Sequence, residues 1–101
     1  MAERGKKREF RFKNGKGVEY HVIFRKPDRR LGADGTCAPP DSKNPVIEIS
    51  PYLSTRGELN TAIHEWAHAF FWSESETTIK RFANSLSRFL FIECKWRKSD
   101  P

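Results

Sequence analysis

Residues 55–72, TRGELNTAIHEWAHAFFW, carry the pattern that decides the architecture of this chain. Apolar side chains recur along this stretch at helical intervals: Leu59, Ala62, Ile63, Trp66 and Phe70. Thr55 and Glu58 have the spacing of a capping box, which marks the start of a helix. We therefore predict a helix from about Arg56 to about Trp72, with its apolar stripe facing a sheet.

A second helical pattern follows after a short interruption at residues 73–75. Its apolar side chains are spaced as on one face of a helix: Ile79, Phe82, Ala83, Leu86, Phe89 and Leu90. We predict a second helix from about Glu76 to about Trp96. Because the interruption is short, this helix should fold back on the first.

Strand patterns precede both helices. Residues 8–25 predict a β-hairpin around an Asn14-Gly15 turn, because apolar side chains occupy alternate positions on both arms. Val46 to Ile49 is a short β-branched run and predicts a third strand. Residues 26–45 between them are rich in Pro, Gly, Asp and Asn, which predicts a long loop. The expected fold class is α+β: a small antiparallel or mixed sheet of about three strands followed by two packed helices.

The length of 101 residues suits one domain with one core. We expect a single domain over residues 1–101, with a basic arm at about 1–9 and the loop at about 26–45. The cysteines, Cys37 and Cys94, are far apart in sequence and are expected to be free thiols. No apolar run reaches the length of about 18 residues that a membrane span needs, and the charged start MAERGKKREF does not resemble a signal peptide. We therefore expect a cytoplasmic protein without a membrane partner.

An HExxH motif, His64-Glu65-Trp66-Ala67-His68, falls inside the first predicted helix. Four residues turn a helix by about 400°, so His64 and His68 project from nearly the same side and can hold one zinc ion. Glu65 lies about 100° further round, which suits a general base that takes a proton from water better than it suits a ligand. The motif predicts Zn²⁺ as cofactor and metal-assisted hydrolysis as the reaction.

A catalytic zinc site usually has three protein ligands and a water molecule, so one further ligand is expected. The candidates are Glu74, Glu76, Cys94, Cys37 and His21. We favour Glu76, because folding the second helix back would bring its first turn near His68. The alternative for Glu76 is a structural role, as the fourth residue of a capping box that starts at Ser73. No glycine follows the motif where metzincins need one, so a glutamate ligand of the gluzincin type fits better.

Two segments carry a resemblance to known proteins. IHEWAHAFF, residues 63–71, followed by ETTIKRFANSL, residues 76–86, resembles the ImmA/IrrE-type metallopeptidases, whose third ligand likewise lies six residues before a Phe-Ala pair. The wider stretch, about residues 37–92, is similar to small HExxH proteins of bacteriophages. This resemblance implies a minimal zincin that cleaves a protein or peptide substrate, with His64, His68 and Glu76 on zinc and Glu65 as base. A phage origin would place it in the host cell cytoplasm.

The charge balance leaves two other functions open. The formal net charge is +6, and basic residues gather in the N-terminal arm around Phe10 and Phe12: Arg4, Lys6, Lys7, Arg8, Arg11 and Lys13. Such an arm could bind nucleic acid, so one alternative is a nucleic-acid-binding module with a structural zinc. The second alternative is a non-catalytic inhibitor or adaptor that keeps the zincin fold and binds a host protein without cutting it.

Overall fold

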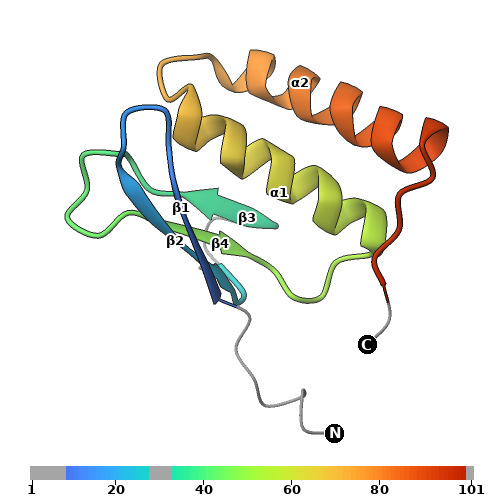
Figure 1. Cartoon of the computed structure of the whole chain (residues 1–101), viewed down its shortest axis with the longest axis horizontal. Coiled ribbons are helices and arrows are strands. Elements are labelled where there is room, and N and C mark those ends of the chain that lie inside the picture. Colours follow the sequence, from blue (N-terminus) through green and yellow to red (C-terminus); the bar gives the residue numbers. More distant parts are fainter. Residues whose placement is uncertain (1–8, 28–32, 100–101) are drawn as a thin grey trace, which may run out of the picture.

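The computed structural model describes residues 9–27 and 33–99. Residues 1–8, with Arg4, Lys6, Lys7 and Arg8 of the basic arm, therefore lie outside the described residues, whereas Arg11 and Lys13 lie within them. Four strands precede two helices and a π-helical turn (Figure 1). In chain order they are β1 (Glu9–Lys13), β2 (Glu19–Phe24), β3 (Gly35–Cys37), β4 (Val46–Ile49), α1 (Thr55–Phe70), α2 (Glu76–Arg88) and η3 (Phe89–Glu93). The predicted α+β fold, a small sheet followed by two packed helices, is confirmed.

The sheet has the order β1-β2-β4-β3 and contains both parallel and antiparallel pairs. β1 and β2 form the predicted antiparallel hairpin, but its loop covers residues 14–18, and Gly17 rather than Gly15 has positive φ. The Asn14 side-chain oxygen accepts hydrogen bonds from the backbone N–H groups of Lys16 and Val18, each 2.9 Å long. β2 and β4 run parallel, with Val22 opposite Ile47. This parallel pair forms the centre of the sheet.

One strand lies inside residues 26–45, the segment predicted to be a loop. β3 pairs antiparallel with β4. At one end the Ser50 N–H donates to the Asp34 carbonyl over 2.8 Å, and at the other the Ala38 N–H donates to the Val46 carbonyl over 2.9 Å. The loop prediction is wrong at this point because the pairing depends on β4, and the three residues of β3 have no pattern of their own.

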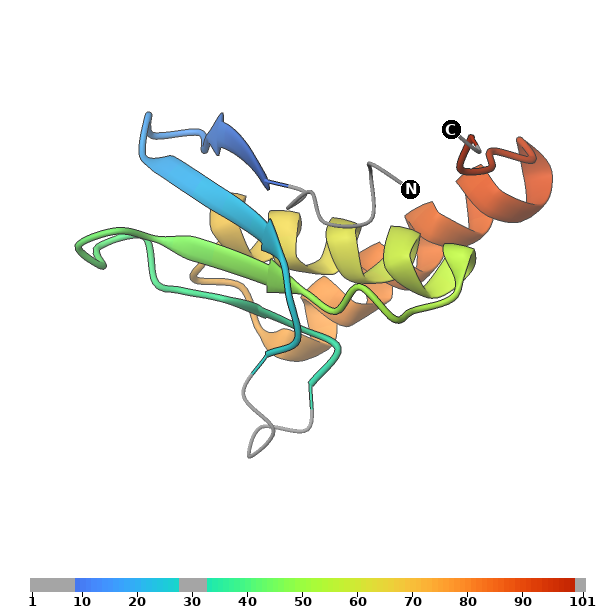
Figure 2. The ribbon, with the colours of Figure 1, turned by 90° about the horizontal axis from the view of Figure 1, so that it is seen from below.

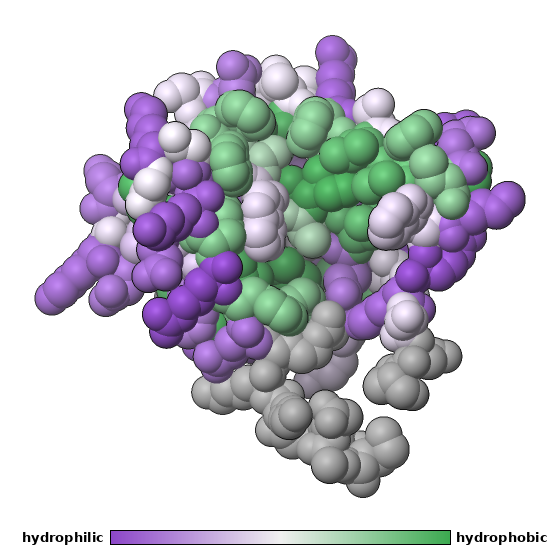
Figure 3. All heavy atoms as spheres, viewed as in Figure 1, coloured by the Kyte–Doolittle hydropathy of each residue, from purple (hydrophilic) through white to green (hydrophobic). Residues whose placement is uncertain are grey.

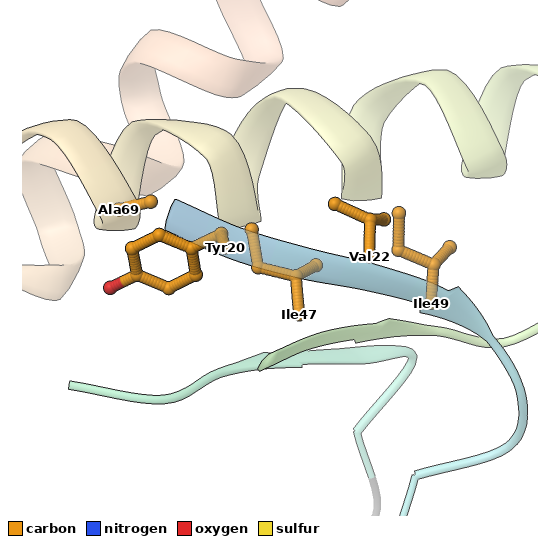
Figure 4. Close-up of a cluster of buried hydrophobic side chains, with 5 residues drawn as sticks. All are labelled: Tyr20, Val22, Ile47, Ile49 and Ala69. Atoms are coloured by element: carbon orange, nitrogen blue, oxygen red, sulfur yellow. The ribbon is translucent and has the colours of Figure 1, made fainter. Parts of the chain in front are cut away.

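The core lies between the sheet and α1 (Figure 4). Five of its side chains are at most 1% exposed: Tyr20, Val22, Ile47, Ile49 and Ala69. At the β1 edge Phe12 stacks on Trp66, with 3.9 Å between the ring centroids. Both helices lie on the same side of the sheet (Figure 2), and α1 lies between the sheet and α2 (Figure 1). The opposite face of the sheet is polar, and Arg25 and Glu48 form an ion pair there.

The apolar stripe of α1 faces the sheet only in part, which corrects the prediction. Trp66 packs on β1, but Phe70 is 42% exposed. On the β3 side the buried residues of α1 are Thr61 and Glu65. The physical reason is the close approach of α1 to Gly35, which has no side chain to hold the helix away. The helix is thereby turned about its axis, and part of the stripe lies beyond the sheet.

Both helices begin at serine caps other than those predicted. The Ser54 hydroxyl accepts a hydrogen bond from the first turn of α1, so Thr55 is the first helical residue and not the cap. The Ser75 hydroxyl caps α2 in the same way. Glu76 is therefore the first residue of α2, and it is not the fourth residue of a capping box that starts at Ser73.

Both helices also end earlier than predicted. α1 ends at Phe70 and not at Trp72. The helical run after α2 continues through η3 to Glu93 and stops before Trp96, because Lys95 adopts the left-handed conformation with φ 59°. None of the described helices has the length and apolar character needed to cross a membrane.

Candidate metal centre

Three side chains from two helices converge on one point. His64 and His68 lie one turn apart on α1, and their Nε2 atoms are 3.2 Å from each other. Glu76, at the start of α2, places Oε1 2.8 Å from Nε2 of His68 and Oε2 3.0 Å from Nε2 of His64. The structure thus brings together the three residues that the sequence predicts as metal ligands.

The spacing of these atoms suits a tetrahedral zinc ion. Bonds of about 2.0–2.1 Å to zinc in a tetrahedral site imply ligand atoms about 3.3 Å apart. The two Nε2 atoms are 3.2 Å apart, and each faces a different Glu76 oxygen at 2.8 or 3.0 Å; one atom from each residue can be chosen so that all three lie within 4.8 Å of one another. Two imidazoles and a carboxylate are also a donor set that zinc prefers. By both distance and chemistry, the residues present fit the ion.

The electrostatic surroundings favour the ligand form of His64. Burial is the main cause that lowers its pKa, and the charges of His68 and Lys80 act in the same direction, while Glu76 opposes them. A lowered pKa leaves the imidazole neutral at neutral pH. Only the neutral ring has a lone pair available for a metal ion.

Polar contacts between the helices hold α2 in the position that brings Glu76 to the histidines. Asn60 lies one turn before His64, and its side-chain amide donates 2.9 Å hydrogen bonds to Asn84 Oδ1 and Ser87 Oγ. Ser87 is only 1% exposed, so its bond with Asn60 is partly shielded from water, whereas the bond between Asn60 and Asn84 is exposed. They fix α2 along the same side of α1 that carries the histidines.

Glu65 lies beside the histidines and faces β3. Its side chain is buried at 7% exposure, and burial together with the charge of Glu76 raises its pKa to about 7. A Cβ atom at Gly35 would lie 3.1 Å from the Glu65 Cγ atom and 2.6 Å from the Thr61 Cγ2 atom. The site therefore holds a carboxyl group that can gain or lose a proton near neutral pH, against a strand that only glycine allows so close.

The sequence did not indicate the role of β3 as the edge of the sheet. Asp34 and Ala38 direct their backbone hydrogen bonds to β4. Alternate residues of an antiparallel strand point the opposite way, so the backbone N–H and C=O groups of Gly35 and Cys37 face the open edge beside Glu65. An isolated glycine in a turn-rich segment was the one available signal.

Three of the other candidate ligands do not join the centre. His21 Nε2 lies 3.1 Å from Glu9 Oε1, on the face of the sheet that points away from α1. Cys94 is exposed beyond η3, and Glu74 is exposed in the turn between the helices. Within the part of the chain that the structure describes, His64, His68 and Glu76 are the only group of this kind.

Cys37 is the fourth alternative ligand, and it also stays outside the group. It is half-buried on β3, and burial followed by the charge of Glu65 raises its pKa to about 12. The thiol therefore stays protonated at neutral pH. Because zinc binds the thiolate, this environment disfavours Cys37 as a ligand.

Comparisons of the chain with protein-family models, with curated proteins and with solved structures found no match. The chemistry of the site must therefore be inferred from its own residues. Their arrangement combines three side chains that could hold a metal ion with a buried carboxyl group on α1, beside β3, which is an edge strand of the sheet that the described residues form.

Proposed function

We propose that this protein is a zinc-dependent hydrolase that cleaves peptide bonds, with His64, His68 and Glu76 as zinc ligands and Glu65 as general base. The observation that carries the proposal is the convergence of the three ligand atoms beside a buried carboxyl group whose pKa is raised to about 7. Strongly shifted ionisable groups next to a metal-binding cluster are typical of catalytic sites.

Each residue has a distinct role in this mechanism. When bound, zinc polarises the substrate carbonyl and makes a coordinated water molecule more acidic. Glu65 takes the proton of the attacking water and passes it to the leaving amine, two transfers that a pKa of about 7 suits at neutral pH. His64 and His68 would hold the ion at a constant position, because they share one rigid helix.

The open edge of β3 supports a peptide as substrate. An extended peptide can pair with an exposed strand through backbone hydrogen bonds. The outward backbone groups of Gly35 and Cys37 lie beside Glu65, so a paired peptide would place a carbonyl near Glu65 and the proposed ligands. The ring of Trp72, 6.1 Å from that of His68, would border a side chain of the same peptide.

Two features count against the alternatives. A nucleic-acid-binding module with structural zinc would use a closed site with four protein ligands. Three converge among the described residues, and the Glu76 side chain is 67% exposed, which leaves room for water or substrate. For a non-catalytic adaptor, a buried Glu65 with a raised pKa would lower stability without any benefit.

The decisive experiment compares Glu65→Gln with Glu74→Gln, because Glu74 is an exposed glutamate outside the ligand group. Zinc content is measured by mass spectrometry, and cleavage is followed with casein and a mixed peptide library. We expect both variants to keep zinc, and Glu65→Gln to lose activity by about 10²- to 10⁴-fold. Full activity of Glu65→Gln would refute the mechanism. Zinc-loaded wild-type protein that cleaves none of these substrates would favour the adaptor.

A further inference from the structure

The two long flanks of α1 differ in chemistry. One flank lies over β3 and carries Glu65 with the two histidines. The other lies over β1, where the rings of Trp66 and Phe70 stack on Phe12. Since β1 and β3 are opposite edges of the sheet, the second flank faces away from the metal centre.

A groove with a volume of about 370 Å³ opens between α1 and α2 on this second flank. Its walls are apolar side chains of both helices, among them Ala62, Ile63, Trp66, Phe70, Phe82 and Leu86. Figure 3, seen from the same side as Figure 1, shows hydrophobic side chains gathered over the helices. Phe71 and Phe82 are 53% and 46% exposed. Exposed aromatic residues grouped in this way mark a surface that another molecule covers.

The groove continues along α1 to a basic end. A second depression shares Ala62 with the first, and Leu59, Trp96 and Lys98 contribute to its lining. α1 has 16 residues, so the two together follow a helix of about 24 Å. The groove is thus long and narrow, apolar in the middle and charged at one end.

Three cations lie at that end of the groove. The guanidinium groups of Arg56 and Arg97 lie 5.8 and 3.7 Å from the centroid of the Phe91 ring. Lys98 Nζ lies 3.1 Å from Glu58 Oε1. Among the described residues that line this end, the cations Arg97 and Lys98 outnumber the single carboxylate, Glu58, which leaves an excess of positive charge where the groove meets the C-terminal segment.

We propose that this groove binds an amphipathic helix of another protein, with apolar side chains along one face and acidic residues at one end. A groove between two helices accepts a third helix through side chains spaced i, i+3, i+4 and i+7. The basic end selects an acidic terminal turn and sets the direction of the bound helix. The interaction is independent of the proposed hydrolase activity, because the groove faces away from the metal centre.

Other occupants match the groove less well. A second copy of this chain would bring together two molecules of net charge +6 each. The first eight residues, MAERGKKR, are basic and have almost no apolar side chains, so they suit neither part of the groove. Nucleic acid would need cations along the whole surface, whereas the middle of the groove is apolar.

The test uses a fluorescent synthetic helix of about 18 residues, with leucines on one face and glutamates in one terminal turn. Two control peptides have the same leucines scattered around the helix, or lysines in place of the glutamates. Binding is measured by fluorescence anisotropy with the full chain. We expect the full chain to bind the first peptide with micromolar affinity. Phe82→Asp should weaken that affinity at least about tenfold. Each control peptide should bind the unaltered chain at least about fivefold more weakly than the first peptide does.

A matched variant is Tyr52→Asp, since Tyr52 is an aromatic residue with 80% exposure that lines neither depression. It should change the affinity by less than about twofold. Circular dichroism melting checks the fold, and Phe71→Asp replaces Phe82→Asp if the latter unfolds. Equal binding of the scattered-leucine or lysine peptide would overturn the proposal. The proposal would also be overturned if the chain dimerises, or binds single-stranded DNA, and Phe82→Asp abolishes that dimerisation or binding.

Discussion

Gly35 is the position where one added methyl group should disturb both the fold and the candidate site. In Gly35→Ala the new Cβ atom would lie 2.6 Å from Thr61 Cγ2, 3.1 Å from the Glu48 carbonyl oxygen and 3.1 Å from Glu65 Cγ. Carbon atoms in contact prefer separations of about 3.5–4.0 Å. Thr61 is buried and β-branched, so it cannot rotate away, and β3 must move from α1 by a large part of an ångström.

The cost of such overpacking is about 1–3 kcal/mol of the free energy of unfolding. For a domain of this size each kcal/mol lowers the melting temperature by about 4–8 °C. Urea denaturation of the zinc-free protein, followed by circular dichroism, measures the free energy. Gly15→Ala is the control, because its Cβ atom would meet nothing closer than Phe70 at 3.6 Å, and we expect a change within about 0.5 kcal/mol.

A second substitution tests the assigned cause. Thr61→Ser removes the methyl group that the new Cβ atom would strike, so the double variant with Gly35→Ala should regain most of the lost stability relative to Thr61→Ser alone. Hydrolytic activity should fall in Gly35→Ala, because Glu65 is displaced with the strand. If Gly35→Ala is as stable as Gly15→Ala, the close approach of α1 to β3 is wrong, and with it the placement of Glu65.

Two further predictions concern the metal and pH. The purified protein should carry about one zinc per chain and melt at a lower temperature after chelation. In a competition titration, Glu76→Gln and Glu76→Ala should both weaken zinc affinity by at least about tenfold. Glu74→Gln should leave the zinc affinity unchanged. Near-normal affinity of Glu76→Gln would remove Glu76 from the ligand set. In the zinc-free protein, burial raises the pKa of Glu65 from 4.5 to about 7, so the folded state holds this proton more tightly than the unfolded state. Stability should therefore fall as pH rises from about 4.5 to 7, by up to about 3 kcal/mol, and Glu65→Gln should remove that part of the slope. If urea titrations show the same dependence of stability on pH for the wild-type protein and Glu65→Gln, the raised pKa of Glu65 is contradicted.

Local chemistry made much of this fold predictable. The hairpin follows from the alternation in both strands, although its loop runs from Asn14 to Val18 and has Gly17, not Gly15, at positive φ. The pairing of His64 with His68 follows from helical periodicity alone. Glu76 could be placed beside them because a short turn leaves a helix few directions in which to continue.

Only the tertiary structure decided what surrounds these residues. β3 is formed by its pairing with β4, and no property of the sequence Gly35-Thr36-Cys37 distinguishes it from a loop. The rotation of α1 about its axis depends on how closely the helix approaches Gly35, a contact between residues far apart in the chain. That rotation buries Glu65 and leaves Phe70 at the surface. Periodicity reveals that a helix has an apolar side, but long-range packing determines which part of that side the sheet covers.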